Sequence, residues 1–534
     1  MIGGRGSLGR RSGSFLVAMV ATIALWILLP GVLRTPEPAS AAVRDDVRIL
    51  AGLPDSIDPA AAGDLGSAAL ISQLYEGLTA YDAGLILRPA LARSWDINDG
   101  GRQVVFHLRP DLTFSDGTPL TGEDVVRSWL RVIDPRSPSP LGSLMADVVG
   151  AEAYMRGADS DPSSVGLRAD ATSVTVDLVR PASDFVSIVS SASFAVVPPD
   201  FGQRGDPLTA SGFVGSGAYV VAGVEPDRLV LEANDRYWAG RPAIGTVELI
   251  GDLGGRSAVS AFEAGDLDYA PISDFDASWI RYNEVLGPAL REEPSLSLEY
   301  LGFDTSRPPF SDVRVRRAFA MAVDWRRIVG LATPTSNASA TGMVPIGIPG
   351  RSDEDFLPPY DPAAARAELA AAGYPAGRDF PTVTFLTGGS SYAAAILDEI
   401  ARELDIEVAF ETMDFGPYFD RLDTEPPHIW SLGWVADYPG RNDFLGILLR
   451  SGATNNYARW ESAEFDAALG EALAATDPAV AGAAFDRAER IVQRDAPVVP
   501  ISYGTGWALA RDGLLGAGQN GLGILRLGGL AWDG

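Results

Sequence analysis

Strand patterns and amphipathic helix patterns alternate along almost the whole 534-residue chain, and this alternation constrains the fold most strongly. Ser173–Leu178 alternates polar and apolar side chains, which is typical of a half-buried strand. Val383–Leu386 followed by Ala393–Leu404 indicates a β-α unit. A chain built this way belongs to the α/β class. It is too long for one ordinary hydrophobic core, so we expect two or three domains.

Local signals predict several elements of this fold. Asn98–Gly101 lies between two apolar runs and contains residues that tolerate positive φ, which predicts a β-hairpin. Thr121, with Asp124 three residues later, approximates a capping box and predicts the start of a helix. Val313–Val329 has the spacing of a single amphipathic helix, and Val498–Tyr503 is typical of a final strand.

The charge and cysteine content exclude several classes of protein. The net charge is -28, and every basic residue other than histidine is arginine. Phosphate contacts need clustered positive charge, so nucleic-acid binding and docking on an anionic membrane surface are both disfavoured. Cysteine is absent, which excludes disulfides, thiolate metal sites, a cysteine nucleophile and a lipidated N-terminal cysteine. We therefore expect a protein that is not a lipoprotein.

Residues 1–42 have the features of an export signal. Arg10 and Arg11 precede the apolar run Phe15–Leu29, and Ala39–Ala41 supplies small residues at a cleavage site. The alternative is an uncleaved anchor helix, since the apolar span approaches the ~20 residues that cross a bilayer. Both interpretations place the remaining chain outside the cytoplasm, and this segment, if uncleaved, would be its only contact with a membrane.

The segment Gly433–Pro439 carries the strongest local indication of a binding site. It places Asp437 between Trp434 and Tyr438, and it contains neither Lys nor Arg. A carboxylate that is half-buried among aromatic rings needs a cationic partner or loses its charge. A ligand ammonium group could be that partner. The alternative is that Asp437 only caps a turn before the proline.

A series of further motifs occurs in order after residue 45. They are Asp55–Pro59, Leu74–Thr79, Arg88–Trp95, Phe106–Arg109, Phe114–Pro119, Glu123–Val126, Gly215–Tyr219, Asn234 with Tyr237, Trp238 and Gly240, Pro309–Phe310 and Val313–Ala318. In this order and spacing the chain resembles the family 5 extracellular solute-binding proteins, the peptide- and nickel-binding receptors of ABC importers.

The resemblance implies an α/β, two-lobed, periplasmic-binding-protein-like fold with an extra domain and a ligand cleft between hinged lobes. Lobe I would be discontinuous, formed by residues 43–76, 198–298 and 505–534. The extra domain would comprise residues 77–197, and lobe II residues 299–504.

The resemblance also implies roles for individual residues. Peptide-binding members carry Gly-Trp-x-x-Asp-Tyr, and Gly433–Tyr438 matches it position by position, which gives Asp437 the role of pairing with a peptide α-ammonium group. The backbone of Gly433 and Val435 would pair with an extended peptide, and Trp434 would form the wall of a side-chain pocket.

Three more residues complete the predicted ligand-binding set. Tyr438 ends the motif. Tyr503 lies where the last cleft strand of the family returns, although a core aromatic is an equal alternative. Arg127 departs from the family pattern, which often has an aromatic residue there. It either meets a ligand carboxylate or faces solvent.

We therefore expect a monomeric receptor that delivers short peptides to an ABC permease, with no cofactor and no bound metal. The same fold could instead bind a nickel chelate, haem or an oligosaccharide. Only His107 and His428 are present, which disfavours a transition metal held by the protein. A secreted hydrolase is the third alternative, but no activated nucleophile or catalytic motif supports it, so we expect no enzyme.

Overall fold

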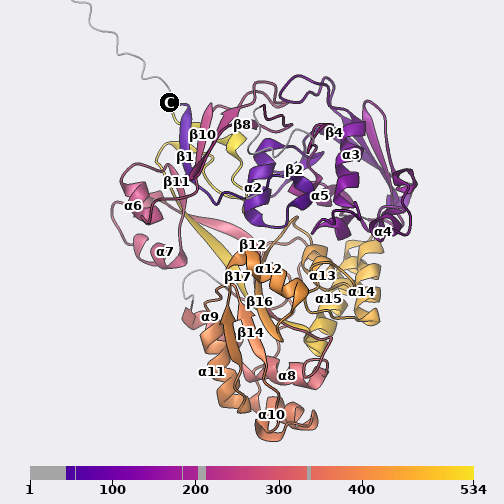
Figure 1. Cartoon of the computed structure of the whole chain (residues 1–534), viewed down its shortest axis with the longest axis vertical. Helices are drawn as coiled ribbons and strands as arrows, with labels where there is room; N and C mark the ends of the chain where they lie inside the picture. The colour runs from indigo at the N-terminus through magenta and orange to yellow at the C-terminus, as the bar shows by residue number, and fades with distance from the viewer. Residues whose placement is uncertain (1–43, 55, 183, 203–211, 333–337) are drawn as a thin grey trace, which may run out of the picture. The chain divides into compact units, whose positions relative to one another are not determined.

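The computed structural model describes residues 44–54, 56–182, 184–202, 212–332 and 338–534 (Figure 1). The predicted export signal at residues 1–42 lies outside these ranges. Helices and strands alternate along the chain, which confirms the α/β class. Among the described residues, no helix has both the length and the apolar character required to cross a membrane.

Eleven strands form one large sheet. Its order is β15-β14-β16-β12-β17-β11-β1-β10-β9-β8, with β13 also paired to β17. The strands are β1 (Asp46–Leu50), β8 (Tyr219–Glu225), β9 (Arg228–Ala233), β10 (Thr246–Ile250), β11 (Tyr269–Pro271), β12 (Leu290–Phe303), β13 (Ala338–Ser339), β14 (Thr384–Thr387), β15 (Ala409–Thr412), β16 (Ile429–Val435) and β17 (Val498–Ala510). Parallel pairs link β1 to β10 and β11, and β14 to β15 and β16.

The two long strands β12 and β17 run through both halves of this sheet (Figure 1). β17 continues past Tyr503, where the predicted final strand ends. The pairing of β12 with β17 is interrupted between Pro294 and Leu298. On one side of the interruption β17 pairs with β11, and on the other side β12 pairs with β16. The interruption lies beside the predicted lobe boundaries at 298/299 and 504/505, which remain predictions.

Residues 77–197 carry a separate sheet in the order β4-β5-β7-β6. Its strands are β4 (Ala92–Asn98), β5 (Gln103–Leu108), β6 (Leu167–Ala169) and β7 (Ser173–Asp177), accompanied by β2 (Thr79–Tyr81), β3 (Leu87–Pro89), α3 (Gly122–Val132), α4 (Ala151–Met155) and α5 (Phe185–Ile188). The predicted hairpin is present, because β4 and β5 pair antiparallel. The predicted capping box is present too: the Thr121 backbone N–H donates to Asp124 Oδ2 at 2.8 Å.

The remaining α-helices are α2 (Leu65–Leu74), α6 (Ala258–Glu263), α7 (Asp274–Ile280), α8 (Val313–Ala322), α9 (Trp325–Ala332), α10 (Pro362–Ala371), α11 (Ala393–Leu404), α12 (Phe415–Thr424), α13 (Arg441–Leu449), α14 (Ala463–Ala474) and α15 (Pro478–Asp495). Near the C-terminus, β18 (Leu514–Leu515) and β19 (Ala531–Trp532) pair as a small two-stranded sheet. Apolar residues of α8 to α11 pack on β12, β14, β16 and β17. Those of α6 pack on β11 and β17. The large sheet thus owes its core to helices on both of its halves.

The prediction of one helix over Val313–Val329 is wrong, because the chain forms α8 and then α9. Val323 is extended, with φ -109° and ψ 128°. Asp324 then accepts a hydrogen bond from Arg327 N at 3.1 Å, as a helix N-cap does. Its own N–H donates to Glu399 Oε2 on α11 at 2.6 Å. The break therefore depends on a contact with a distant helix.

The segment 77–197 packs directly against the region around β16 and α13. Apolar residues from both form one continuous buried cluster. Two polar contacts join the same parts: Tyr438 donates to Asp184 Oδ2 at 3.0 Å, and Asn455 Nδ2 donates to Pro140 O at 3.1 Å. These contacts enclose the space described next.

Candidate ligand-binding site

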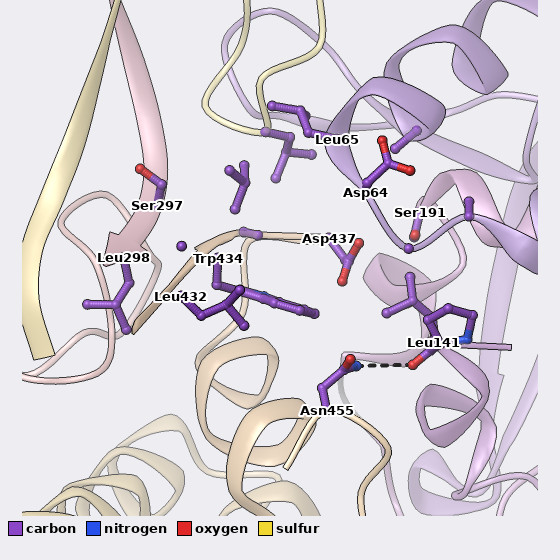
Figure 2. Close-up of a pocket in the computed structure, with 18 of the residues that line it drawn as sticks. Asp64, Leu65, Leu141, Ser191, Ser297, Leu298, Leu432, Trp434, Asp437 and Asn455 are labelled. Carbon is purple, nitrogen blue, oxygen red and sulfur yellow. Dashed lines mark hydrogen bonds between the residues drawn. The ribbon is translucent and has the colours of Figure 1, made fainter. Parts of the chain in front are cut away.

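A cavity of about 660 Å³ lies where β12 and β16 face α2 and the segment 77–197 (Figure 2). Segments far apart in the sequence form its wall: residues 61–65, 68, 140–141, 191–193, 297–299, 432–437, 522 and 524, with two residues each from α12, β17 and the 455–457 loop. A volume of this size is within the range of small-ligand pockets.

Strand β16 presents a free backbone edge to this cavity. β14 pairs with β16 only at residues 429–431, whereas β12 pairs with it as far as Val435. Ala436 N–H donates to Leu296 O on β12 at 2.9 Å. Because backbone groups alternate direction along a strand, those of Gly433 and Val435 point away from β12. They have no strand partner in the described part of the chain, so an extended ligand could pair with them.

Asp437 lies two residues after Val435, the last residue of this edge. Its carboxylate points toward Ser191 and Leu141 on the opposite wall (Figure 2). Its Oδ2 atom is buried and has no hydrogen-bond partner, and no ion pair to Asp437 exists within the described ranges. Burial raises the pKa of Asp437 to about 7. A cationic group placed here would favour the ionised carboxylate.

A second carboxylate, Asp443 at the start of α13, holds this segment in place. Trp434 Nε1 donates to Asp443 Oδ2 at 2.9 Å. The Asp437 backbone N–H donates to the same carboxylate, at 3.2 Å and 3.3 Å from its two oxygens. Burial raises the pKa of Asp443, and the nearby charge of Asp437 raises it further. The sequence analysis does not predict a role for Asp443. The only sequence feature that points to it is the position of an acidic residue near the start of the helix after the motif.

The charged residues of the cavity wall all have the same sign. Asp64, Glu299, Asp423 and Asp437 line the cavity, and no Arg or His of the described chain does. Of these four, only Asp437 is predicted from the sequence. Walls of one sign concentrate the field in a cleft, so this cavity attracts positively charged ligands and repels anions.

The structure brings together four of the seven predicted ligand-binding residues: Gly433, Trp434, Val435 and Asp437 all line the cavity. Tyr438 is fully buried behind them, where its hydroxyl also accepts a hydrogen bond from Asn442 Nδ2 at 3.0 Å.

Tyr503 and Arg127 are not among the residues that line the cavity. The buried Tyr503 hydroxyl donates to Gly342 O at 2.9 Å and accepts from Thr341 N at 3.1 Å. Arg127 donates to Asp124 Oδ1 at 2.8 Å and lines a different, open hollow on α3. Both side chains therefore have protein partners where they lie.

The two histidines lie in separate places. His107 Nε2 is 2.8 Å from Asp96 Oδ2 on the β4–β5 hairpin, and His428 Nδ1 accepts from Thr384 N at 3.2 Å. In the described ranges, no group of three or more His, Asp or Glu side chains is arranged to hold a metal ion. The donors present give no support for a metal centre.

Comparisons with known proteins agree with this geometry. The model of the bacterial extracellular solute-binding proteins, family 5 (middle), matches residues 87–456. Probable deoxycholate-binding periplasmic protein YgiS of Escherichia coli K12 is 30% identical over 471 residues, covering 84% of this chain and 86% of YgiS. Periplasmic oligopeptide-binding protein OppA of the same strain is 27% identical over 477 residues, covering 84% of this chain and 85% of OppA.

Solved structures share the architecture. The E. coli murein tripeptide binding protein MppA superposes with a TM-score of 0.83 at 27% identity, covering 92% of this chain and 98% of MppA. An unliganded open form of MppA, at 26% identity and covering 92% of this chain and 97% of MppA, gives a TM-score of 0.68. The arrangement of this chain is thus nearer to the first MppA structure than to the open form.

Proposed function

Because the chain belongs to the bacterial extracellular solute-binding proteins of family 5, we propose that it is an extracytoplasmic receptor that binds short peptides and delivers them to the permease of an ABC importer. OppA and MppA bear the names of oligopeptide- and murein-peptide-binding proteins, and both are named as periplasmic. The family members are binding proteins, and we propose the same non-enzymatic role here, in a monomer exported through its N-terminal segment.

One observation carries the proposal: an unpartnered buried carboxylate oxygen lies at the end of a free strand edge that faces the cavity. Asp437 would pair with the α-ammonium group of the peptide, in a charge-assisted contact that fixes one end of the ligand. Gly433 and Val435 would hydrogen-bond to the peptide backbone, which every peptide offers whatever its side chains.

The proposed cycle uses the interruption between β12 and β17. We propose that the two lobes, divided at 298/299 and 504/505, bend apart at this point to admit the peptide. Closure would then bury the ligand until the permease opens the complex.

Titration calorimetry with a free tripeptide and its N-acetylated form tests the proposal. Acetylation removes the ammonium charge, so we expect at least a tenfold loss of affinity. Asp437→Asn should cause a similar loss for the free peptide and little change for the acetylated one. Asp512→Asn serves as a control, because Asp512 is exposed and outside the cavity. Equal affinity of the wild type for both peptides would refute the ammonium contact.

A further inference from the structure

We propose that Glu299 forms a subsite for a basic side chain, so that this receptor selects peptides with Lys or Arg as their second, third or fourth residue. This inference rests on the peptide-binding function proposed above. It concerns which peptides bind, and its test separates the two.

The four carboxylates of the cavity wall are not equivalent. Asp64 caps α2, since it accepts hydrogen bonds from Ser67 N at 2.9 Å and Ser67 Oγ at 2.6 Å. Asp423 lies near the positive charge of Arg459. Asp437 and Glu299 have no ion pair to any residue in the described ranges. Two cavity carboxylates thus remain uncompensated, and one ammonium group compensates only one of them.

Glu299 adjoins an empty space on the wall. It lies opposite Gly433 on β16 and opposite Ser502 on β17, and directly opposed residues of antiparallel strands place their side chains on the same face. A Cβ atom built on Gly433 would have no neighbour within 4 Å. The missing side chain leaves room beside the Glu299 carboxylate, and both residues line the cavity.

The local contacts of Glu299 leave its charge in need of a partner. Ser390 Oγ donates a short hydrogen bond to Glu299 Oε1. Burial raises the pKa of Glu299, and this one hydroxyl opposes the shift only in part. A half-buried carboxylate with an open space next to it is stabilised in its ionised form by an incoming ammonium or guanidinium group.

The spacing along β16 indicates which ligand residue reaches Glu299. Gly433 and Asp437 are four residues apart, or roughly 13 Å in an extended chain at about 3.3 Å per residue. A peptide anchored at Asp437 and running along the free edge therefore brings its second, third or fourth residue next to Gly433. A lysine or arginine side chain at one of these positions can reach the Glu299 carboxylate.

The same wall should reject negative charge. The described residues of the cavity wall include no cation for an acidic side chain or for the terminal carboxylate of a short peptide. Amidating the C-terminus of a tripeptide should consequently strengthen its binding. An anionic ligand such as deoxycholate should bind poorly, although the relative YgiS carries that ligand in its name.

Calorimetry at fixed pH and ionic strength tests the subsite with Ala-Ala-Ala-Ala, Ala-Lys-Ala-Ala, Ala-Ala-Lys-Ala, Ala-Ala-Ala-Lys and Ala-Ala-Glu-Ala. We expect at least one lysine peptide to bind tenfold or more tightly than tetra-alanine, and the glutamate peptide to bind more weakly. Glu299→Gln should remove the lysine preference while changing the affinity for tetra-alanine less than about twofold. Glu292→Gln should keep the preference, because Glu292 is exposed on the same strand outside the cavity.

The outcomes are distinguishable. If tetra-alanine and all three lysine peptides bind equally, the subsite is refuted and the peptide receptor stands. If Glu299→Gln weakens all peptides alike, or lowers the melting temperature markedly, Glu299 is structural and the subsite is refuted. If none of the peptides binds, the proposed function itself fails.

Discussion

The hydroxyl of Tyr438 donates a hydrogen bond of 3.0 Å to Asp184 Oδ2, across the boundary between the cleft segment and α5. Tyr438 follows Asp437 directly in the chain, so this contact lies beside the proposed ammonium site. The other oxygen, Asp184 Oδ1, is buried without a hydrogen-bond partner. Burial raises the pKa of Asp184, and the Tyr438 hydroxyl opposes that shift. The bond can form only while these two parts of the molecule are in contact.

Tyr438→Phe should accelerate ligand release. The substitution removes the only side-chain hydrogen bond that the described residues make to the Asp184 carboxylate, which costs about 1–2 kcal/mol. We expect the dissociation rate to rise about 5- to 30-fold and the association rate to change little, as measured by stopped-flow fluorescence. Tyr360→Phe is the matched control, because the Tyr360 hydroxyl contacts Glu403 on the outer surface. A change confined to the association rate would contradict this role.

The affinity for a peptide with a free α-amino group should be highest between about pH 7 and 8 and fall on both sides. The ligand ammonium needs the ionised form of Asp437, whose pKa is about 7 without ligand. Below pH 7 binding must displace a proton, so the affinity should fall about tenfold for each pH unit. Above about pH 8 the peptide α-amino group loses its own charge and the affinity falls again. Calorimetry from pH 5 to 9 measures both the fall in affinity at low pH and the fall at high pH. A constant affinity between pH 5 and 7 would exclude the proton displacement.

The ligand-free protein should gain stability from Asp437→Asn at high pH. The folded pKa of Asp437 is raised above its ordinary value of about 4, so the wild type loses stability as pH rises from about 4 to 7. Asparagine cannot ionise and avoids this loss. We expect the unfolding free energy of the variant to exceed that of the wild type by about 1–3 kcal/mol at pH 8.

Urea denaturation at pH 4 and pH 8 measures this difference, which should vanish at the lower pH. Asp512→Asn should show no such pH dependence. A variant that is less stable than the wild type at pH 8 would mean that Asp437 stabilises the ligand-free fold.

Two glycines on adjacent strands should respond oppositely to alanine. A Cβ at Gly302 on β12 would overlap the buried ring of Trp430, its cross-strand neighbour, whereas a Cβ at Gly433 meets nothing within 4 Å. Gly302→Ala should therefore destabilise the protein by about 1–3 kcal/mol, and Gly433→Ala by less than about 0.5 kcal/mol. Urea denaturation compares them. Gly433→Ala should nevertheless weaken the binding of lysine peptides, because the methyl group enters the space beside Glu299.

Features that depend on neighbours in the sequence could be predicted. The capping box joins Thr121 and Asp124, and the hairpin needs only the residues of β4 and β5, so the sequence pattern contains all the partners. The break between α8 and α9 could not be predicted, because Glu399 on another helix supports Asp324. The helical spacing of apolar residues continues from α8 into α9, so the sequence pattern gives no sign of the break.

The same holds for the candidate site: residues of one short motif could be predicted, whereas residues brought in from other strands could not. Gly433, Trp434, Val435 and Asp437 form one short motif, and all four line the cavity. Glu299 lies on a different strand, and only the register of β12 against β16 brings it opposite Gly433. An acidic residue in a strand pattern gives no sign of the space beside it, so its part in the cavity wall required the structure.

The connection through β12 and β17 has a consequence for how the molecule moves. A single covalent connection would let two bodies rotate about three axes. β12 and β17 are paired on both sides of the Pro294–Leu298 interruption, and two connected strands would restrict the proposed opening to essentially one bending coordinate. The opening proposed above would then follow a single path, so distances measured across the cavity from different pairs of probes should change together.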